Sequence, residues 1–147
     1  MKNSINKFTS KNFEEIFSNT YANYTQEDLI RVMDNNPDLT SNGFGNLNPV
    51  EFKNFRQQLR NSLREFQSCC VYLSLCKKSK RIYKILSSYG LKSRVEFMNG
   101  YVSNGSFIAA AIHCNFKAHR IINSPNAYFD IDDLVFKGCR ELNLGTV

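Results

Sequence analysis

One place in the chain brings a thiol and imidazoles close together in sequence. His113 is adjacent to Cys114, and His119 follows five residues later. A cysteine thiolate activated by a histidine base is a common arrangement for nucleophilic catalysis. That chemistry needs a fixed geometry between sulfur and ring, which a junction between a helix and a strand does not supply. We therefore expect a partly buried cysteine with two ordinary histidines, and predict no catalytic residue and a protein that is not an enzyme.

The cysteines and paired acids also lack the spacing of a metal or acid–base site. The five cysteines contain no C-x-x-C pair, and they are Cys69, Cys70, Cys76, Cys114 and Cys139. A zinc site would require the fold to gather distant thiols, so we expect reduced, mostly buried cysteines, no metal and no cofactor. Adjacent acids such as Asp132 and Asp133 point in different directions and do not form an acid–base pair.

Positive charge is concentrated in one segment. Between positions 77 and 96 the chain carries seven basic residues against the single acid Glu96, and this surplus equals the whole net charge of +6. The basic residues are Lys77, Lys78, Lys80, Arg81, Lys84, Lys92 and Arg94. Such a segment is the electrostatic pattern expected for phosphate contact, although charge runs often form only a solvated helix face.

The elements that would position these residues begin with a helical N-terminal part, residues 1–48. Thr9 or Ser10 is a suitable cap for a first amphipathic helix, and Thr25 with Asp28 has the spacing of a capping box for a second. The stretch 35–48 contains five Asn, two Gly and one Pro, which favours a loop. Whether this loop is ordered stays open.

A long apolar stripe follows. Asn48, Pro49 and Glu51 form a strong helix start, and Phe or Leu or Cys side chains then recur every three or four residues as far as Leu73. The pattern predicts one core helix over 49–76. With 147 residues, 42% of them apolar, we expect a single domain over 1–147, with residues 77–147 as its third part.

Residues 77–147 have the pattern of a winged helix-turn-helix unit with a C-terminal helix. A short helix ends at Asn99–Gly100, Ser103 caps a second helix over 104–114, and strands at 116–122 and 127–131 flank a turn at 123–126. The predicted fold is therefore mainly α with a small β-hairpin. On this reading the second helix presents Asn104 and Ser106 to a groove, and the hairpin presents Lys117 and Arg120 to phosphates.

Three segments of this unit resemble a known pattern. SSYGLKSRVE, GYVSNGSFIAAAIHCNFK and NSPNAYFDI, within residues 87–131, are similar to small uncharacterised proteins of plasmids and phages. These share Tyr-x-Leu-Lys, then Tyr-[Val/Ile]-Ser-Asn-Gly-x-x-Ile-Ala-Ala-Ala, then a Pro-Asn-Ala turn. Ser93 departs from the pattern, which has His there. The resemblance implies a mobile genetic element, and hence either DNA control or interference with a host defence system.

The sequence thus leads to two hypotheses. The first is a nucleic-acid-binding protein, with DNA the expected partner, that binds mainly through phosphates with little sequence specificity. The alternative is a non-enzymatic protein that binds and inhibits a host defence complex, as anti-CRISPR or anti-restriction proteins do. The chain has no apolar run long enough for a signal peptide or a membrane span, so we expect a cytoplasmic protein without a membrane partner and of open oligomeric state.

Overall fold

The computed structural model describes residues 18–45, 47–82, 84 and 86–132. Within these ranges the chain is mainly helical with a small amount of antiparallel β-structure, as the sequence predicted. The elements are η2 (Ser18–Asn23), α3 (Gln26–Asn35), α4 (Pro49–Arg60), α5 (Leu63–Ser74), β1 (Lys77–Lys78), α6 (Ser88–Asn99), α7 (Asn104–His113), β2 (Ala118–Arg120), β3 (Ala127–Phe129) and β4 (Ile131–Asp132). Most of the predicted first helix and the predicted C-terminal helix lie outside the described residues.

Helix α3 begins at the predicted capping box. The backbone N–H of Asp28 donates to the Thr25 hydroxyl at 3.2 Å, and the backbone N–H of Thr25 donates to the Asp28 carboxylate at 3.0 Å. This reciprocal pair satisfies two donors that a helix start otherwise leaves open. Leu29, Val32 and Met33 form the buried face of the helix.

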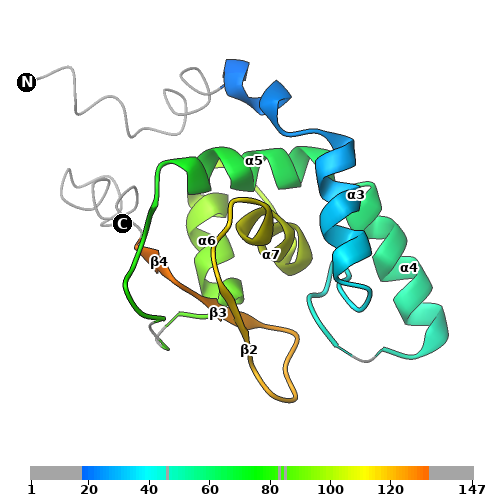
Figure 1. The fold of residues 1–147 in the computed structure, drawn as a ribbon. Coiled ribbons are helices and arrows are strands. Elements are labelled where there is room, and N and C mark those ends of the chain that lie inside the picture. The colour runs from blue at the N-terminus through cyan, green and yellow to red at the C-terminus, as the bar shows by residue number, and fades with distance from the viewer. Residues whose placement is uncertain (1–17, 46, 83, 85, 133–147) are drawn as a thin grey trace, which may run out of the picture.

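The prediction of one helix over 49–76 is wrong, because the stripe is divided between α4 and α5. The break falls at Asn61 and Ser62, where the Ser62 hydroxyl donates to the Gln58 carbonyl at 2.6 Å. The Gln26 side chain donates to the Arg60 carbonyl at 2.8 Å and so caps the end of α4. Side-chain hydrogen bonds to carbonyls compete with the regular helical ladder. The two helices consequently run in different directions (Figure 1).

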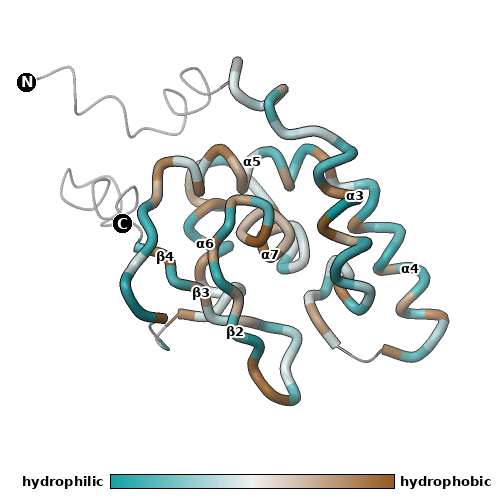
Figure 2. Tube along the Cα trace, in the orientation of Figure 1, coloured by the Kyte–Doolittle hydropathy of each residue, from teal (hydrophilic) through white to brown (hydrophobic). Residues whose placement is uncertain are grey.

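Helix α7 lies at the centre of the fold, with α3, α5 and α6 packed against it (Figure 1). Its first eight residues, Asn104 to Ala111, are all buried. Figure 2 shows α7 as largely apolar, whereas α3 and α4 at the edge of the molecule alternate between polar and apolar residues. The run Ala109–Ala111 is fully buried, and these small side chains allow close packing of the neighbouring helices. The helix predicted to enter a groove is therefore the core helix.

The asparagine-rich loop is ordered over residues 36–45. The Arg56 guanidinium donates to the carbonyls of Met33, Asn36 and Leu39 at 2.8, 3.0 and 2.7 Å. The backbone N–H of Gly105 donates to the Ser41 carbonyl at 2.9 Å. One side of the loop is thus fixed to α4 and the other to the start of α7.

The predicted hairpin is present, with shorter strands than expected. In β2 and β3, Ala118 pairs with Phe129 and Arg120 with Ala127. A second antiparallel pair joins β1 to β4. The Ser88 hydroxyl accepts a hydrogen bond from the Ala127 backbone at 3.1 Å, which attaches the hairpin to the start of α6. Among the described helices, none combines the length and the apolar character that crossing a bilayer requires.

Candidate functional site

A polar cavity of about 490 Å³ opens where the first turns of α6 and α7 meet two loops. We call it the tyrosine cavity, and its lining residues are Ser41, Asn42, Tyr89, Lys92, Tyr101, Asn104, Pro125 and Asn126. This volume lies within the range of small-molecule sites. The lining comes from three separate parts of the chain, so the cavity exists only in the folded protein.

Lys92 is the charged residue of the cavity, and only 7% of it is exposed. Its ammonium bonds to the Glu96 carboxylate at 3.1 Å and lies 4.8 Å from the ring centre of Tyr89 and 5.3 Å from that of Tyr101. The other Glu96 oxygen accepts from the Val102 backbone at 3.3 Å. A buried ammonium needs such compensation, because desolvation otherwise disfavours its charged form. Lys92 is therefore fixed in place as a hydrogen-bond donor whose charge is balanced.

Asn104 is the second polar residue, with 6% exposure. Its Nδ2 donates to the Asn42 carbonyl at 3.0 Å and to the Asn126 side chain at 2.9 Å. A backbone carbonyl can only accept, so the orientation of the amide is settled. Among the described residues, Asn104 Oδ1 is the buried side-chain oxygen or nitrogen without a hydrogen-bond partner. A buried acceptor without a donor is energetically costly, so the two hydrogen bonds of Nδ2 are obtained at the expense of an unsatisfied Oδ1.

The two tyrosines are the accessible part of the cavity. Tyr89 is 59% exposed and Tyr101 is 72% exposed, although both are large aromatic residues. Phe97, on the same helix as Tyr89, is 50% exposed and does not line the cavity. Exposed aromatic rings beside a cavity form a surface on which planar groups stack.

The three segments of the resemblance noted above meet at this cavity. Tyr-x-Leu-Lys contributes Tyr89 and Lys92, Tyr-Val-Ser-Asn-Gly contributes Tyr101 and Asn104, and Pro-Asn-Ala contributes two further lining residues. Tyr89 and Tyr101 were not predicted as site residues, because the prediction was restricted to side chains that contact phosphates or base edges. The closeness of Tyr89 and Tyr101 in sequence to the basic segment was the signal that could have found them.

The prediction that an exposed helix presents Asn104 and Ser106 to a nucleic-acid groove is wrong. Ser106 is fully buried, and its hydroxyl donates to the Glu65 carboxylate at 3.1 Å. Asn104 is held by two loops, as described above. Both residues start a helix that is covered by other elements, so neither is presented to a groove on an exposed helix. Their role in the structure is to fix the start of α7.

The other predicted basic residues lie mainly on the surface. Lys77 and Lys78 form β1, and Lys80, Arg81 and Lys84 follow in the connection to α6, all exposed. Arg94 is half-buried on α6. Of the seven basic residues in this segment, the structure brings only Lys92 into the tyrosine cavity.

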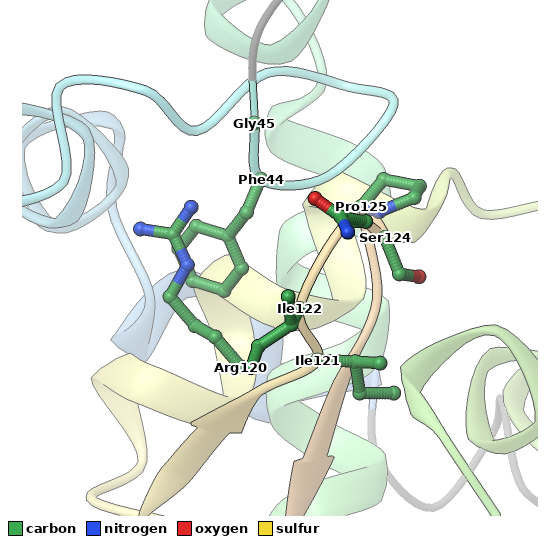
Figure 3. Close-up of a pocket in the computed structure, with 8 residues that line it drawn as sticks. Phe44, Gly45, Arg120, Ile121, Ile122, Ser124 and Pro125 are labelled. Carbon is green, nitrogen blue, oxygen red and sulfur yellow. The ribbon is translucent and has the colours of Figure 1, made fainter.

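The two basic residues that were predicted to contact phosphates from the hairpin, Lys117 and Arg120, have different surroundings. Lys117 is exposed, whereas the Arg120 guanidinium bonds to Asp38 at 2.5 Å and lies 4.2 Å from the Phe44 ring centre. Figure 3 shows this stacking at a second cavity, of about 530 Å³, between the hairpin turn and the loop before α4. The charge of Arg120 is balanced by Asp38, so Arg120 is less suited to phosphate contact than the sequence suggested.

The four described cysteines are all at least partly buried. Cys69 and Cys70 are buried, Cys76 and Cys114 are half-buried, and none of these four forms a disulfide. His113 Nε2 lies 3.9 Å from the Asp28 carboxylate, while His119 is exposed on β2. In the described ranges, no three His, Cys, Asp or Glu side chains gather in a way that could hold a metal ion.

The tyrosine cavity thus combines two exposed aromatic rings with the buried Lys92 ammonium and the buried Asn104 amide. Comparison of the chain with protein-family models, with curated proteins and with solved structures found no match. The function is accordingly argued from this geometry.

Proposed function

We propose that the protein binds single-stranded nucleic acid, with DNA as the expected partner, through α6 and the basic segment before it. The observation that carries this proposal is the position of Tyr89 and Tyr101. These exposed rings flank the tyrosine cavity. Tyr89 lies within the segment 77–96 that carries the whole net positive charge, and Tyr101 follows that segment. Proteins that bind single strands combine a positive surface for the backbone with aromatic side chains on which bases stack.

The positive surface is provided by side chains that reach solvent. Five exposed basic residues lie between positions 77 and 84, namely Lys77, Lys78, Lys80, Arg81 and Lys84. No acidic residue lies between them. They precede Tyr89 directly in the chain. Phosphate contacts of this kind release counterions, so the affinity should fall steeply with salt.

The burial of α7 argues for a single strand rather than a duplex. The winged helix-turn-helix prediction is supported by the order of the elements alone, α5, β1, α6, α7, β2 and β3, because β1 pairs with β4 in a sheet separate from the hairpin. In such a unit the helix equivalent to α7 enters the major groove. Here α3 packs on α7 and the loop at residue 41 bonds to its first turn. We regard the winged-helix order as a scaffold that positions α6.

Fluorescence anisotropy with a labelled oligonucleotide tests the proposal. The same sequence is offered as a single strand and as a duplex, in 50 and 200 mM salt. We expect tighter binding of the single strand and, for about four phosphate contacts, a roughly 50-fold loss between the two salt concentrations.

The double charge reversal Lys80→Glu with Arg81→Glu should weaken binding at least tenfold, since it removes two phosphate contacts and adds two repulsive charges. Lys53→Glu, at an exposed position on α4, is the matched control and should have a much smaller effect. Absence of binding at 50 mM salt, or equal affinity of the reversed variant and the original chain, overturns the proposal.

A protein partner in a host defence complex is the second candidate. The exposed aromatic rings of Tyr101 and Phe97 favour it, because aromatic side chains are enriched at the centres of protein interfaces. The alanine-rich face of α7 gives this candidate no support, since that face packs inside the protein. Capture of a host complex that persists after nuclease treatment, together with no binding to oligonucleotides, would favour this candidate.

A further inference from the structure

We propose that Cys114 and Cys70 form an oxidation site, at which a small hydroperoxide such as hydrogen peroxide converts the two thiols into a reversible disulfide. Cys114 reacts with the peroxide, and Cys70 then reacts with the oxidised Cys114. The site lies where α5 packs against the end of α7, and its cavity shares no lining residue with the tyrosine cavity. The inference is therefore independent of the proposed binding of nucleic acid.

A third cavity, of about 350 Å³, makes Cys114 accessible to a small molecule. We call it the thiol cavity, and its lining residues are Tyr24, Leu73, Ser74, Cys76, Lys78, His113, Cys114 and Phe116. A water molecule takes up about 30 Å³ in the liquid, so hydrogen peroxide, with its two oxygen atoms, fits in this space. Cys69 and Cys70 are buried and do not line the cavity, so Cys114 is the first of these three thiols that a peroxide meets.

Two contacts place Cys70 against the end of α7. The ring of Phe66, one turn before Cys70 on α5, lies 5.6 Å from the His113 ring between their centres. Ser74, one turn after Cys70, lines the thiol cavity together with Cys114. Residues four apart share one face of a helix, so Cys70 lies on the face of α5 that meets this end of α7. The thiols of Cys70 and Cys114 accordingly share a hydrogen bond.

The backbone position of Cys114 favours the approach of the two sulfur atoms. A disulfide requires a sulfur–sulfur distance of about 2.05 Å, so the sulfurs must come closer than a hydrogen bond holds them. Cys114 is the C-cap of α7, and Asn115 after it has a φ of 66°, in the left-handed region where helices end. A residue at the end of a helix can shift with less disturbance of helical hydrogen bonds than Cys70 in the middle of α5.

The surroundings of the two thiols assign their roles. The hydrogen bond from Cys70 lowers the pKa of Cys114, and the basic side chain of Lys78 lines the same cavity. Burial raises the pKa of Cys70, which therefore stays a protonated donor. Since the thiolate is the nucleophilic form of cysteine, Cys114 is the thiol prepared for attack on the peroxide.

The reaction has two steps. The Cys114 thiolate attacks one oxygen of hydrogen peroxide, the O–O bond breaks, and the leaving hydroxide takes up a proton to become water, which leaves a sulfenic acid on Cys114. The Cys70 sulfur then attacks the Cys114 sulfur and the S–O bond breaks. The hydroxide that leaves takes the Cys70 thiol proton and forms a second water. Two thiols lose two electrons in total, and one peroxide is reduced to two waters.

Cys76 is the competing partner, because it is half-buried and lines the thiol cavity with Cys114. Its sulfur donates to the Tyr72 carbonyl at 3.6 Å, within its own end of α5. The Cys70 thiol instead donates to Cys114 itself. The structure therefore favours Cys70 over Cys76 as the residue that completes the disulfide.

Peptide mapping of the full chain tests the site. The folded protein is treated with one molar equivalent of hydrogen peroxide at pH 7, remaining thiols are blocked with N-ethylmaleimide, and the digest is examined by mass spectrometry without reduction. We expect the Cys70–Cys114 pair to be at least about tenfold more abundant than any other pair, including pairs with Cys139, because disulfide formation depends on which sulfur is within reach. Dithiothreitol should restore both thiols.

Three variants separate the roles of the thiols. Cys70→Ser keeps a hydroxyl donor beside Cys114 but cannot form the disulfide, so a sulfenic acid should persist on Cys114 and be trapped by dimedone. Cys114→Ala should leave Cys70 reduced at the same dose of peroxide. Cys69→Ala removes the neighbouring buried thiol and is the matched control, which should form the Cys70–Cys114 pair as the original chain does. Circular dichroism establishes that each variant is folded.

Several results would overturn the site. A predominant pair of Cys114 with Cys76 or Cys139 would mean that Cys70 is not its partner. Oxidation of Cys69 or Cys70 before Cys114 would contradict the assigned order. An equal mixture of pairs in the folded chain and in the urea-unfolded chain, or no oxidation of Cys114 by excess peroxide, would show that the fold does not create the site. None of these results bears on the binding of oligonucleotides.

Discussion

Asn104 and Asn42 are joined across 62 residues of sequence by a hydrogen bond of 3.0 Å from the Asn104 side chain to the Asn42 carbonyl. Asn104 is the first residue of the core helix α7, and Asn42 lies at the tip of the asparagine-rich loop. The bond therefore connects the centre of the fold to a surface loop. Because both residues line the tyrosine cavity, the cavity depends on the position of that loop.

The docking of this loop depends on the absence of a side chain at Gly105. A Cβ at that position would lie 1.8 Å from the Thr40 carbonyl oxygen, so Gly105→Ala must displace the loop from α7. We expect a loss of about 3 kcal/mol in the free energy of unfolding, measured by urea denaturation.

The matched control is Gly90→Ala, also in the first turn of a helix. There a Cβ meets only the Cδ2 of Leu86, at 2.8 Å, and this end of a flexible side chain can move. We expect unchanged or slightly higher stability. A Gly105→Ala protein as stable as Gly90→Ala would contradict the close approach of loop and helix.

Arg56 secures the other side of the loop. Arg56→Met keeps most of the side-chain length and removes three hydrogen bonds to the carbonyls of Met33, Asn36 and Leu39. We expect a loss of about 2 kcal/mol in unfolding free energy, because bonds from a charged donor are stronger than neutral ones. Lys53→Met, on the exposed side of α4, should change stability by less than about 0.5 kcal/mol.

The capping box of α3 predicts an acid-dependent contribution to stability. The hydrogen bond from the Thr25 backbone N–H lowers the pKa of Asp28 below its ordinary value, and Arg31 and His113 act in the same direction. A carboxyl group with a lowered pKa stabilises the fold above its unfolded pKa of about 3.9, and this contribution disappears as the pH falls through the folded pKa.

Asp28→Ala should therefore cost about 1 kcal/mol at pH 7, with the difference from the original chain disappearing below about pH 3. Urea denaturation at pH 7, 5 and 3 measures it. Asp34→Ala, at an exposed position near the end of the same helix, should show no such loss at pH 7. A difference that persists at pH 3 would mean that Asp28 acts through packing instead of charge.

Cys114 should be ionised more readily than Cys69 and Cys70. A hydrogen bond from Cys70 lowers the pKa of Cys114, whereas burial raises the pKa of Cys69 and of Cys70. Since the thiolate is the reactive form, alkylation by iodoacetamide should modify Cys114 at a lower pH than Cys69 or Cys70. Peptide mass spectrometry over a series of pH values identifies the modified residue.

Cys70→Ala tests the cause of that reactivity. Without the Cys70 donor, the pH at which Cys114 becomes alkylated should rise. Cys69→Ala leaves the donor in place and serves as the control. If Cys70 is modified before Cys114 in the original chain, the direction of their hydrogen bond is opposite to the one described.

Local sequence patterns predicted the secondary structure well where they depend on neighbouring residues. The capping box at Thr25, the helix start at Asn48, the cap at Ser103 and the hairpin all occur at or near the predicted positions. The prediction of a continuous helix over 49–76 was wrong, because the regular spacing of an apolar stripe does not show where a helix is interrupted. Its break depends on the side-chain bond of Ser62 and on Gln26, which is distant in sequence.

By itself, the sequence determined a mainly helical protein with a hairpin and a segment that holds the whole net positive charge. Periodicity and capping act over a few residues, so they can be read directly from the chain. Only the tertiary structure decided which helix is buried and which aromatic rings stay exposed. Burial depends on contacts between distant segments, here α3 and the asparagine-rich loop against α7, and these contacts turned an expected recognition helix into the core and brought Tyr89, Tyr101, Lys92 and Asn104 together.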